Sequence, residues 1–215
     1  MERRSRRVDF RNQKEVVCRV TRLGEIIKDL QNGFACGERD SNGIIQLRMN
    51  NVDRLGNMVM DEYIRVPLKY YSDVFDLQSG DILFNHTNSA ELVGKTLHYS
   101  GYSEPVTFSN HFVRLRVDTN RADTRYISSY FNLLWSNKFF ESYCDRWIGQ
   151  AAFQPKKLTE VKISLPPLDE QRRIAAEIDR QLSTVEKAKQ AAAAQMAAIN
   201  AMPAAILRQA FSGQM

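Results

Sequence analysis

The stretch Leu165-Pro166-Pro167-Leu168-Asp169-Glu170-Gln171-Arg172-Arg173-Ile174 divides the chain into two parts of different character. Two adjacent prolines hold their neighbours extended and cannot lie inside a helix. Beyond them no Gly or Pro occurs from Asp169 to Met202, which at 1.5 Å per residue predicts a helix about 50 Å long. We expect Asp169 to cap the start of this helix, and Pro203 to kink or restart it before Gly213 ends it.

The predicted helix carries an apolar stripe. Its members recur at spacings of three, four or seven residues and are Ile178, Leu182, Val185, Ala192, Met196, Ile199 and Ile206. From Ala191 to Ile206 only Gln195 and Asn200 are polar, so this segment is apolar nearly all round and must be surrounded. The stripe could pack back on the chain's own domain, but a small domain cannot surround the far end of a rod about 50 Å long. We therefore expect a coiled-coil contact with a helix of another chain.

The part before the double proline mixes strand-like and helix-like patterns, which predicts an α+β fold. The expected strands are Ile44–Met49, Asp61–Val66, Asp81–Asn85 and Thr107–Val117. The third of these strands follows a turn at Gln78-Ser79-Gly80. The expected helices are Leu23–Leu30, closed by Asn32-Gly33, then Asp123–Trp135 and Lys138–Trp147. The aromatic side chains of the last two helices are expected to face the core, namely Tyr126, Tyr130, Phe131, Trp135, Phe139, Tyr143 and Trp147.

Composition excludes several classes of protein. With 215 residues, 43% hydrophobic and 26% charged, the chain is neither disordered nor fibrous. It contains no charge-free apolar run of about 20 residues, so no membrane span is predicted. The N-terminus lacks the apolar segment of a secretory signal. Cys18, Cys36 and Cys144 are odd in number and widely spaced, which favours a reducing cytoplasm over a disulfide framework.

The N-terminal residues are strongly basic. Residues 1–22 contain eight Arg or Lys and three acidic residues within a chain of net charge +5. Such an arm either contacts phosphates or is a solvated, mobile terminus, and the sequence leaves both interpretations open. We treat residues 1–14 as a separate basic arm.

Motifs that would indicate catalysis are weak. Gly94-Lys95-Thr96 resembles the end of a phosphate-binding loop, but Ser89 stands where that loop needs its first Gly. Asp145, Glu160 and Lys162 loosely resemble the carboxylates and lysine of a metal-dependent nuclease, a pattern that often arises by chance. His86, His98 and His111 lack the spacing of a zinc or catalytic site. We expect no metal, no cofactor and no catalysis by the chain itself.

Three polar segments instead favour a nucleic-acid surface. Arg48 to Arg54 and Asn85 to Ser89 each follow a predicted strand, and Arg146 to Lys157 combines amides with cations. Asn and Gln can pair with adenine edges and Arg with guanine edges, while Lys and Arg hold phosphates. Each segment alone is ordinary loop composition, but three together in a basic protein support DNA binding.

Several of these segments resemble the DNA-specificity subunit of type I restriction-modification systems. The resemblance rests on Leu23-Gly24-Glu25-Ile26, Ser79–Asn85 with the following His86–Ser89, Glu91–Lys95, Leu165–Ile174 and Ile206–Gly213. The Pro-Pro-Leu-x-Glu-Gln junction is its most specific piece, and the likeness extends from about Leu23 to Gly213.

The resemblance implies a target-recognition domain joined to a spacer helix. In that family the domain reads one half of a split DNA site, while antiparallel helices separate two such domains and dock methyltransferase subunits. Those subunits bind S-adenosylmethionine, and a restriction subunit joins for cleavage. Family members normally carry two domains and two helices, so this chain is expected to be a natural half-subunit or half of a longer protein, pairing with itself as a homodimer through the helix.

We therefore predict a non-catalytic DNA-recognition subunit with a recognition domain at residues 15–165 and a spacer helix at 166–215. Base reading is expected from Arg48, Asn50, Asn51, Arg54, Asn85, His86, Thr87 and Asn88. Phosphate contacts are expected from Lys95, Arg146, Lys156 and Lys157, with Gln150 and Gln154 in either role. The alternatives are a helical adaptor that bridges other subunits without reading bases, and an independent Mg²⁺-dependent nuclease.

Overall fold

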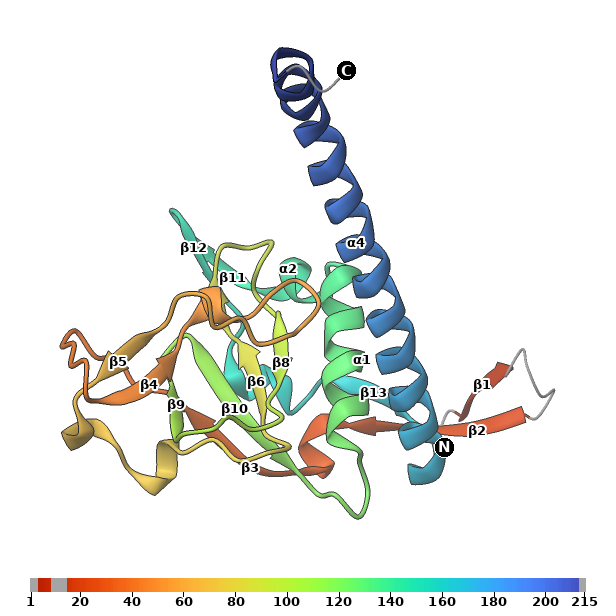
Figure 1. Cartoon of the computed structure of the whole chain (residues 1–215). Coiled ribbons are helices and arrows are strands. Elements are labelled where there is room, and N and C mark those ends of the chain that lie inside the picture. Colours follow the sequence, from red (N-terminus) through yellow and green to blue (C-terminus); the bar gives the residue numbers. More distant parts are fainter. Residues whose placement is uncertain (1–3, 9–14, 213–215) are drawn as a thin grey trace. The chain divides into compact units, whose positions relative to one another are not determined.

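The computed structural model describes residues 4–8 and 15–212, with side chains described from residue 18 onward. The chain forms two compact units, Met1–Arg172 and Arg173–Met215 (Figure 1). The strands are β1 (Arg4–Val8), β2 (Glu15–Arg22), β3 (Ile27–Asn32), β4 (Ile44–Leu47), β5 (Ile64–Val66), β6 (Ile82–Asn85), β7 (Thr87–Asn88), β8 (Thr96–His98), β9 (Val106–Phe108), β10 (Phe112–Val117), β11 (Asp145–Trp147), β12 (Gln150–Ala152) and β13 (Lys162–Leu165). The α-helices are α1 (Thr124–Ser136), α2 (Phe139–Tyr143), α3 (Pro155–Leu158) and α4 (Leu168–Phe211), and short 3-10 turns occur at Leu23–Glu25, Met49–Asn51, Leu68–Tyr70 and Asp73–Phe75.

The strands of the first unit form four small sheets. Their orders are β1-β2-β13, β3-β10-β6-β8, β5-β4-β9 and β11-β12-β7. Only the β4–β9 pairing is parallel among the described strands; the others are antiparallel. The predicted α+β fold followed by a long helix is therefore confirmed.

Strand β6 is buried on both faces and organises the core. Leu83 packs on one face in a hydrophobic cluster with Leu47, Phe108 and Phe112. Phe84 points to the other face, where its ring lies 4.9 Å from that of Phe140. Helices α1 and α2 cover this second face and contribute Phe131 and Phe140 (Figure 1). A strand buried on both sides reads as a continuous apolar run, which is why Ile82–Phe84 was recognisable in the sequence.

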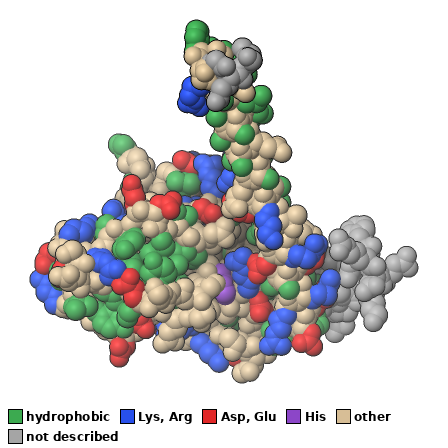
Figure 2. Space-filling model, in the orientation of Figure 1, with side chains coloured by type: hydrophobic (Ala, Val, Ile, Leu, Met, Phe, Trp, Pro, Cys, Tyr) green, Lys and Arg blue, Asp and Glu red, His purple; other side chains and the backbone are tan. Residues whose placement is uncertain are grey.

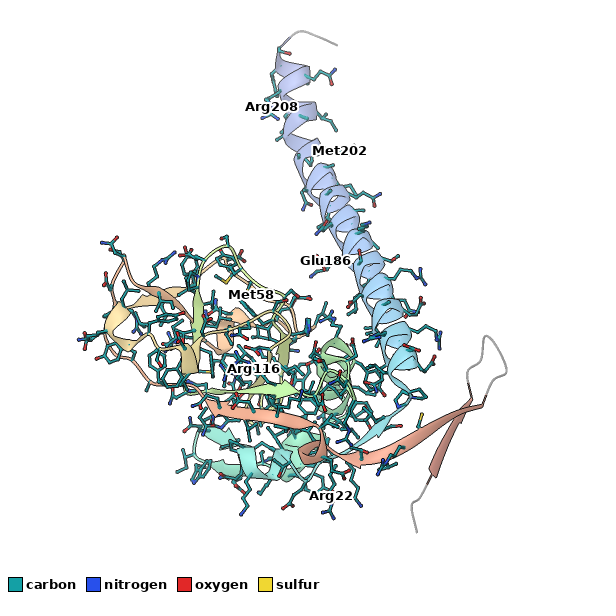
Figure 3. The ribbon with its side chains drawn as sticks, turned by 90° about the horizontal axis from the view of Figure 1, so that it is seen from below. Arg22, Met58, Arg116, Glu186, Met202 and Arg208 are labelled. Carbon is teal, nitrogen blue, oxygen red and sulfur yellow. The ribbon has the colours of Figure 1, made fainter. Side chains whose placement is uncertain are left out.

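Ion pairs tie β10 to its surroundings. Arg116 Nε donates to Asp81 Oδ1 at 2.7 Å, just before β6 begins (Figure 3). Arg114 donates to Asp29 Oδ2 at 2.6 Å and to the Asp76 carbonyl at 2.9 Å. These bonds pair the buried Arg114 and the partly buried Arg116 with carboxylates, which offsets much of the cost of removing their charges from water, although Arg114 Nε has no partner among the described residues.

Several predicted elements were correct and others were wrong. The Gln78–Gly80 turn is confirmed by the Asp81 amide, which donates to the Gln78 carbonyl at 2.9 Å. The predicted helix Leu23–Leu30 is wrong, because this segment is a 3-10 turn followed by β3. Thr107–Val117 is two strands separated by a turn at residues 109–111, not one. The predicted strand Asp61–Val66 is shorter than expected and comprises only β5.

The predicted helix Lys138–Trp147 is correct only in its first half, α2, because the chain then turns into β11. Tyr143 and Trp147 are consequently exposed, at 61% and 58%, so their prediction as core residues is wrong. Helix α1 agrees with its prediction, and the Asp123 side chain caps it by accepting from the Tyr126 amide at 2.8 Å. Tyr126 and Phe131 of α1 are buried as expected.

The double-proline junction is anchored by Gln171. This side chain is fully buried: Nε2 donates to the carbonyls of Pro166 (2.8 Å) and Arg121 (3.1 Å), and Oε1 accepts from the Asp123 amide (2.9 Å). Helix α4 begins at Leu168, and the Pro167 carbonyl accepts from the amides of Glu170 and Gln171. Asp169 thus lies in the first turn and is not the N-cap that the sequence suggested.

Helix α4 continues through Pro203 to Phe211, so the helix does not restart at Pro203, and a kink there stays a prediction. The unit Arg173–Met215 carries hydrophobic and uncharged side chains along its distal half, including Met202 (Figures 2 and 3). Val185, Met196, Ile199 and Ile206 are each more than half exposed, and Ile178 and Leu182 are partly covered. A contact of this stripe with another helix stays a prediction.

Two further observations concern composition. No helix within residues 4–8 and 15–212 combines the length and apolar character needed to cross a membrane. Cys18, Cys36 and Cys144 are free thiols.

Candidate nucleic-acid interface

Two of the three polar segments lie side by side in one sheet. Strand β7 pairs with β12, which places Thr87 opposite Ala152 and Asn88 opposite Ala151. The Phe153 amide also donates to the His86 carbonyl at 2.8 Å, which extends this contact beyond the strands. Residues about 65 positions apart in the sequence therefore form one continuous edge (Figure 1).

The third segment joins them through the turn at residues 109–111. The Ser109 amide donates to the Leu47 carbonyl at 2.9 Å, just before Arg48. The amides of His86 and Thr87 both donate to the His111 carbonyl, at 3.0 and 3.4 Å. We call the three segments Arg48–Arg54, Asn85–Ser89 and Arg146–Lys157 together the polar edge.

Most of the predicted DNA-contacting side chains on the polar edge are accessible. The exposed ones are Asn50, Arg54, Arg146, Gln150, Gln154, Lys156 and Lys157. Arg48, His86, Thr87 and Asn88 are half-buried. This mixture of amides and cations is the set of donors and acceptors that base edges and phosphates require.

Three predicted DNA contacts are corrected by burial. Asn51 is 1% exposed: its Oδ1 accepts from the Arg48 amide, and its Nδ2 donates to the carbonyls of Val59 and Glu62. Lys95 is 7% exposed and donates through Nζ to the carbonyls of Met49 and Val52, while burial lowers its pKa. Asn85 is fully buried within β6. Asn51 and Lys95 hold the loop under the polar edge, whereas the Asn85 side-chain amide has no hydrogen-bond partner among the described residues, and none of the three faces solvent.

The His86 ring is fixed by its neighbours. Its Nε2 lies 3.0 Å from the Asn110 carbonyl, and its Nδ1 lies 3.0 Å from Thr87 Oγ1. Because a carbonyl only accepts, Nε2 carries the proton and Nδ1 accepts from the Thr87 hydroxyl. Burial lowers the pKa of His86, with a smaller contribution from His111, so the ring is neutral at pH 7. Burial and the nearby Arg48 charge likewise lower the pKa of His111.

The cations beside the hairpin have internal partners. Lys157 Nζ lies 3.0 Å from Asp145 Oδ1, and Gln154 Nε2 donates to Asp145 Oδ2 at 3.1 Å. These bonds lower the pKa of Asp145, with Lys157 as the larger cause. Arg146 donates to the Glu141 carbonyl at 2.9 Å. A phosphate would therefore have to share Arg146 and Lys157 with these partners, whereas Lys156 extends into solvent.

Two features of this region were not predicted from the sequence: the hairpin of β11 and β12, and the turn at Asn110 and His111. Trp147, which ends β11, and Ile148, which follows it in the loop, are both exposed, although the sequence pattern placed Trp147 on a buried helix face. The one local signal was Gly149, which has a φ of +75° and follows Ile148 in a two-residue loop.

Neither catalytic pattern is supported by the geometry. Lys95 of the Gly94-Lys95-Thr96 motif donates to backbone carbonyls, and the amides of Gly94, Lys95 and Thr96 donate to the Asn85 carbonyl, the Leu92 carbonyl and Asn132 Oδ1, so the amides that a phosphate would need are already engaged. Asp145 is engaged by Lys157 and Gln154. Across the part of the chain that the structure describes, no three His, Cys, Asp or Glu side chains are grouped to hold a metal ion.

The fold of this chain, a mixed α+β domain continued by a long helix, is similar to that of three solved chains. A chain from a structural study of complex assembly in a type I R-M system matches with a TM-score of 0.68 and 24% identity, covering 92% of this chain and 46% of that one. The HsdS subunit from Thermoanaerobacter tengcongensis matches with a TM-score of 0.61 and 24% identity, covering 92% and 45%. The S subunit from M. genitalium matches with a TM-score of 0.57 and 12% identity, covering 84% and 42%.

Sequence comparison identifies the family. Residues 22–194 match the type I restriction modification DNA specificity domain, and the chain belongs to this family. It is 27% identical over 197 residues to a putative type I restriction enzyme specificity subunit from Methanocaldococcus jannaschii, covering 81% of this chain and 45% of that protein. It is 25% identical over 198 residues to the StySPI specificity subunit from Salmonella potsdam, covering 91% and 42%. The chain thus spans less than half the length of these relatives.

Proposed function

We propose that this chain recognises one half of a split site in double-stranded DNA through the polar edge, and that it catalyses no reaction itself. The observation that carries the proposal is the convergence of three separate polar segments on one edge, joined by β7–β12 pairing and the turn at residues 109–111. Membership of the DNA specificity domain family supports it independently.

The burial data refine the predicted roles. Base reading is assigned to Arg48, Asn50, Arg54 and Asn88, with His86 and Thr87 shaping the edge through their mutual hydrogen bond. Lys156, Arg146 and Lys157 contact phosphates, and Gln150 and Gln154 serve either role. Asn51, Asn85 and Lys95 are removed from the set because they are buried.

Paired variants test this division. Asn50→Ala is expected to weaken binding to the selected site by about 1–3 kcal/mol and to relax specificity at one position. Lys156→Ala is expected to weaken binding to cognate and scrambled duplexes alike. It should also reduce the slope of log affinity against log salt concentration by about one. The measurement is fluorescence anisotropy at two salt concentrations, on a site found by selection from random duplexes with the methyltransferase subunits present.

Other outcomes would point to the alternative functions. Equal affinity of the unaltered chain for cognate and scrambled duplexes would leave a helical adaptor that does not read bases. Cutting of a plasmid by the purified chain with Mg²⁺ would instead indicate a nuclease.

The proposal extends to assembly. The apolar stripe of α4 pairs with the same helix of a second copy, and methyltransferase subunits dock on the paired helices. These subunits would carry S-adenosylmethionine, and a restriction subunit would join for cleavage. Supporting this, Ile199 and Ile206 are exposed on a helix that forms its own compact unit, and exposed apolar stripes indicate interaction sites. A cytoplasmic location likewise stays a prediction.

A further inference from the structure

We propose that Ile148, at the tip of the β11–β12 hairpin, determines specificity by contacting the 5-methyl group of a thymine in the major groove. This inference rests on the proposed DNA-binding function. It adds a base-reading residue of apolar chemistry to an edge that otherwise uses hydrogen bonds and charge.

The hairpin presents its tip to solvent. Trp147 and Gln150 face each other across the two strands, and Ile148-Gly149 forms the loop between them. Ile148 is 105% exposed. In the first unit the hairpin projects from the body, and an apolar side chain marks its end (Figures 1 and 2). A β-branched side chain with no cover contributes nothing to the fold, so its chemistry is available to a partner.

The stem below the tip is held firmly. Ala151 and Phe153 are buried, and β12 pairs with β7. Lys157 and Gln154 both bind the Asp145 carboxylate at the base of β11. An ordered stem lowers the conformational entropy that the hairpin would lose on binding, so a small contact at its tip can affect affinity.

The surroundings of the tip favour DNA over a protein surface. Arg146 and Gln150 lie on the two strands of the hairpin and Lys156 lies in α3 after it; all three are exposed, and their charge and amide groups complement phosphates and base edges. The major groove, about 12 Å wide, admits a two-stranded ribbon, whereas the minor groove is about half as wide. In the major groove the thymine methyl is the apolar group on a base edge, and an aliphatic side chain is its natural contact.

The test removes the methyl group from the DNA. After the target site is selected, each thymine of the half-site is replaced in turn by deoxyuridine, and affinity is measured for the full chain and for Ile148→Ala. For the unaltered chain, one replacement is expected to weaken binding about three- to fivefold, the effect of losing one buried methyl contact. For Ile148→Ala, the same replacement is expected to have no further effect.

Two controls accompany this test. Leu68→Ala shortens an aliphatic side chain of similar size, 63% exposed, in another segment of the chain. This variant should still lose affinity when the thymine is replaced by deoxyuridine. Ile148→Leu keeps an apolar tip and should retain most of it.

Three results would overturn the proposal. The first is specific binding that no deoxyuridine replacement changes. The second is an equal loss at that thymine in the unaltered chain and in Ile148→Ala. The third is an increase in the fluorescence of 2-aminopurine placed in the site, seen with the unaltered chain but not with Ile148→Ala. This increase would show that Ile148 inserts between bases instead of contacting a methyl group. Absence of any specific binding by the unaltered chain would instead reject the proposed function, and this inference with it.

Discussion

Asn50 and Asn51 are adjacent, identical in chemistry and opposite in environment. Asn50 is exposed on the 3-10 turn Met49–Asn51, while Asn51 turns inward and is 1% exposed. The inward amide bonds to Arg48, Val59 and Glu62, and so closes the loop that carries its neighbour. One residue therefore supports the position of the other.

Replacing Asn51 with Ala is expected to lower the free energy of unfolding by about 2–3 kcal/mol, because it removes three partly buried hydrogen bonds, one from the Arg48 amide and two to the carbonyls of Val59 and Glu62. Urea denaturation followed by circular dichroism measures this. Asn50→Ala is the matched control and should change stability by less than about 0.5 kcal/mol while weakening specific DNA binding. Unchanged stability of Asn51→Ala together with a selective loss of DNA affinity would mean that Asn51 reads a base after all.

The sequence could not separate these two residues. Both residues lie in a polar run after an apolar strand. The carbonyls that accept hydrogen bonds from Asn51 belong to residues eight and eleven positions further along the chain. The same limit applies to Lys95, whose partners Met49 and Val52 lie more than 40 positions away. Composition identified the segments of the polar edge, while long-range contacts decided which members face solvent.

At the scale of elements, strongly patterned segments were predictable and mixed ones were not. Helix α1 and strand β6 have clear periodicity and a recognisable cap or turn, and both appear as expected. In contrast, Asp145–Trp147 continues a helical pattern but forms a strand because β12 pairs with it. Leu30 and Gln31 likewise pair with Leu115 and Arg114 of β10, and this tertiary pairing outweighs the helical spacing of Leu23–Leu30.

The connection between β7 and β8 depends on Gly94. Its φ is +98°, and an added Cβ would overlap the ring of Phe140 in the aromatic core. We expect Gly94→Ala to destabilise the first unit by more than 2 kcal/mol, because it adds a steric clash to the backbone strain. Thermal denaturation monitored by near-ultraviolet circular dichroism would measure the loss.

Two other glycines separate the causes of that loss. Gly101 has a φ of +102° but open space around its Cβ position, so Gly101→Ala should show the backbone cost alone. Gly37 has neither constraint and should tolerate alanine. Equal destabilisation by Gly94→Ala and Gly101→Ala would remove Phe140 from the explanation.

At the scale of the molecule, the chain is a mixed α+β domain and a helix that form separate compact units. The first unit buries its aromatic and aliphatic side chains in its own core. The second is a helix whose residues Met196, Ile199, Met202, Ile206 and Leu207 are all more than half exposed. A protein rarely leaves such a stripe uncovered, which supports the proposal that a partner helix packs on it.

Ile199→Asp tests whether that partner is a second copy of the chain. In a two-fold contact each helix presents the same patch, so one substitution places two carboxylates in the apolar seam. Because burying an unpaired carboxylate costs several kcal/mol, the dimer dissociation constant should rise by at least about 30-fold, seen as a shift to the monomer mass in analytical ultracentrifugation. Gln190→Asp adds the same charge nine residues before Ile199, on the opposite face of the helix, and should leave the dimer intact. If the unaltered chain and Ile199→Asp have the same monomeric mass at all concentrations, the stripe does not pair with itself.

Binding of Ile199→Asp to methyltransferase subunits would then show whether they cover the helix directly.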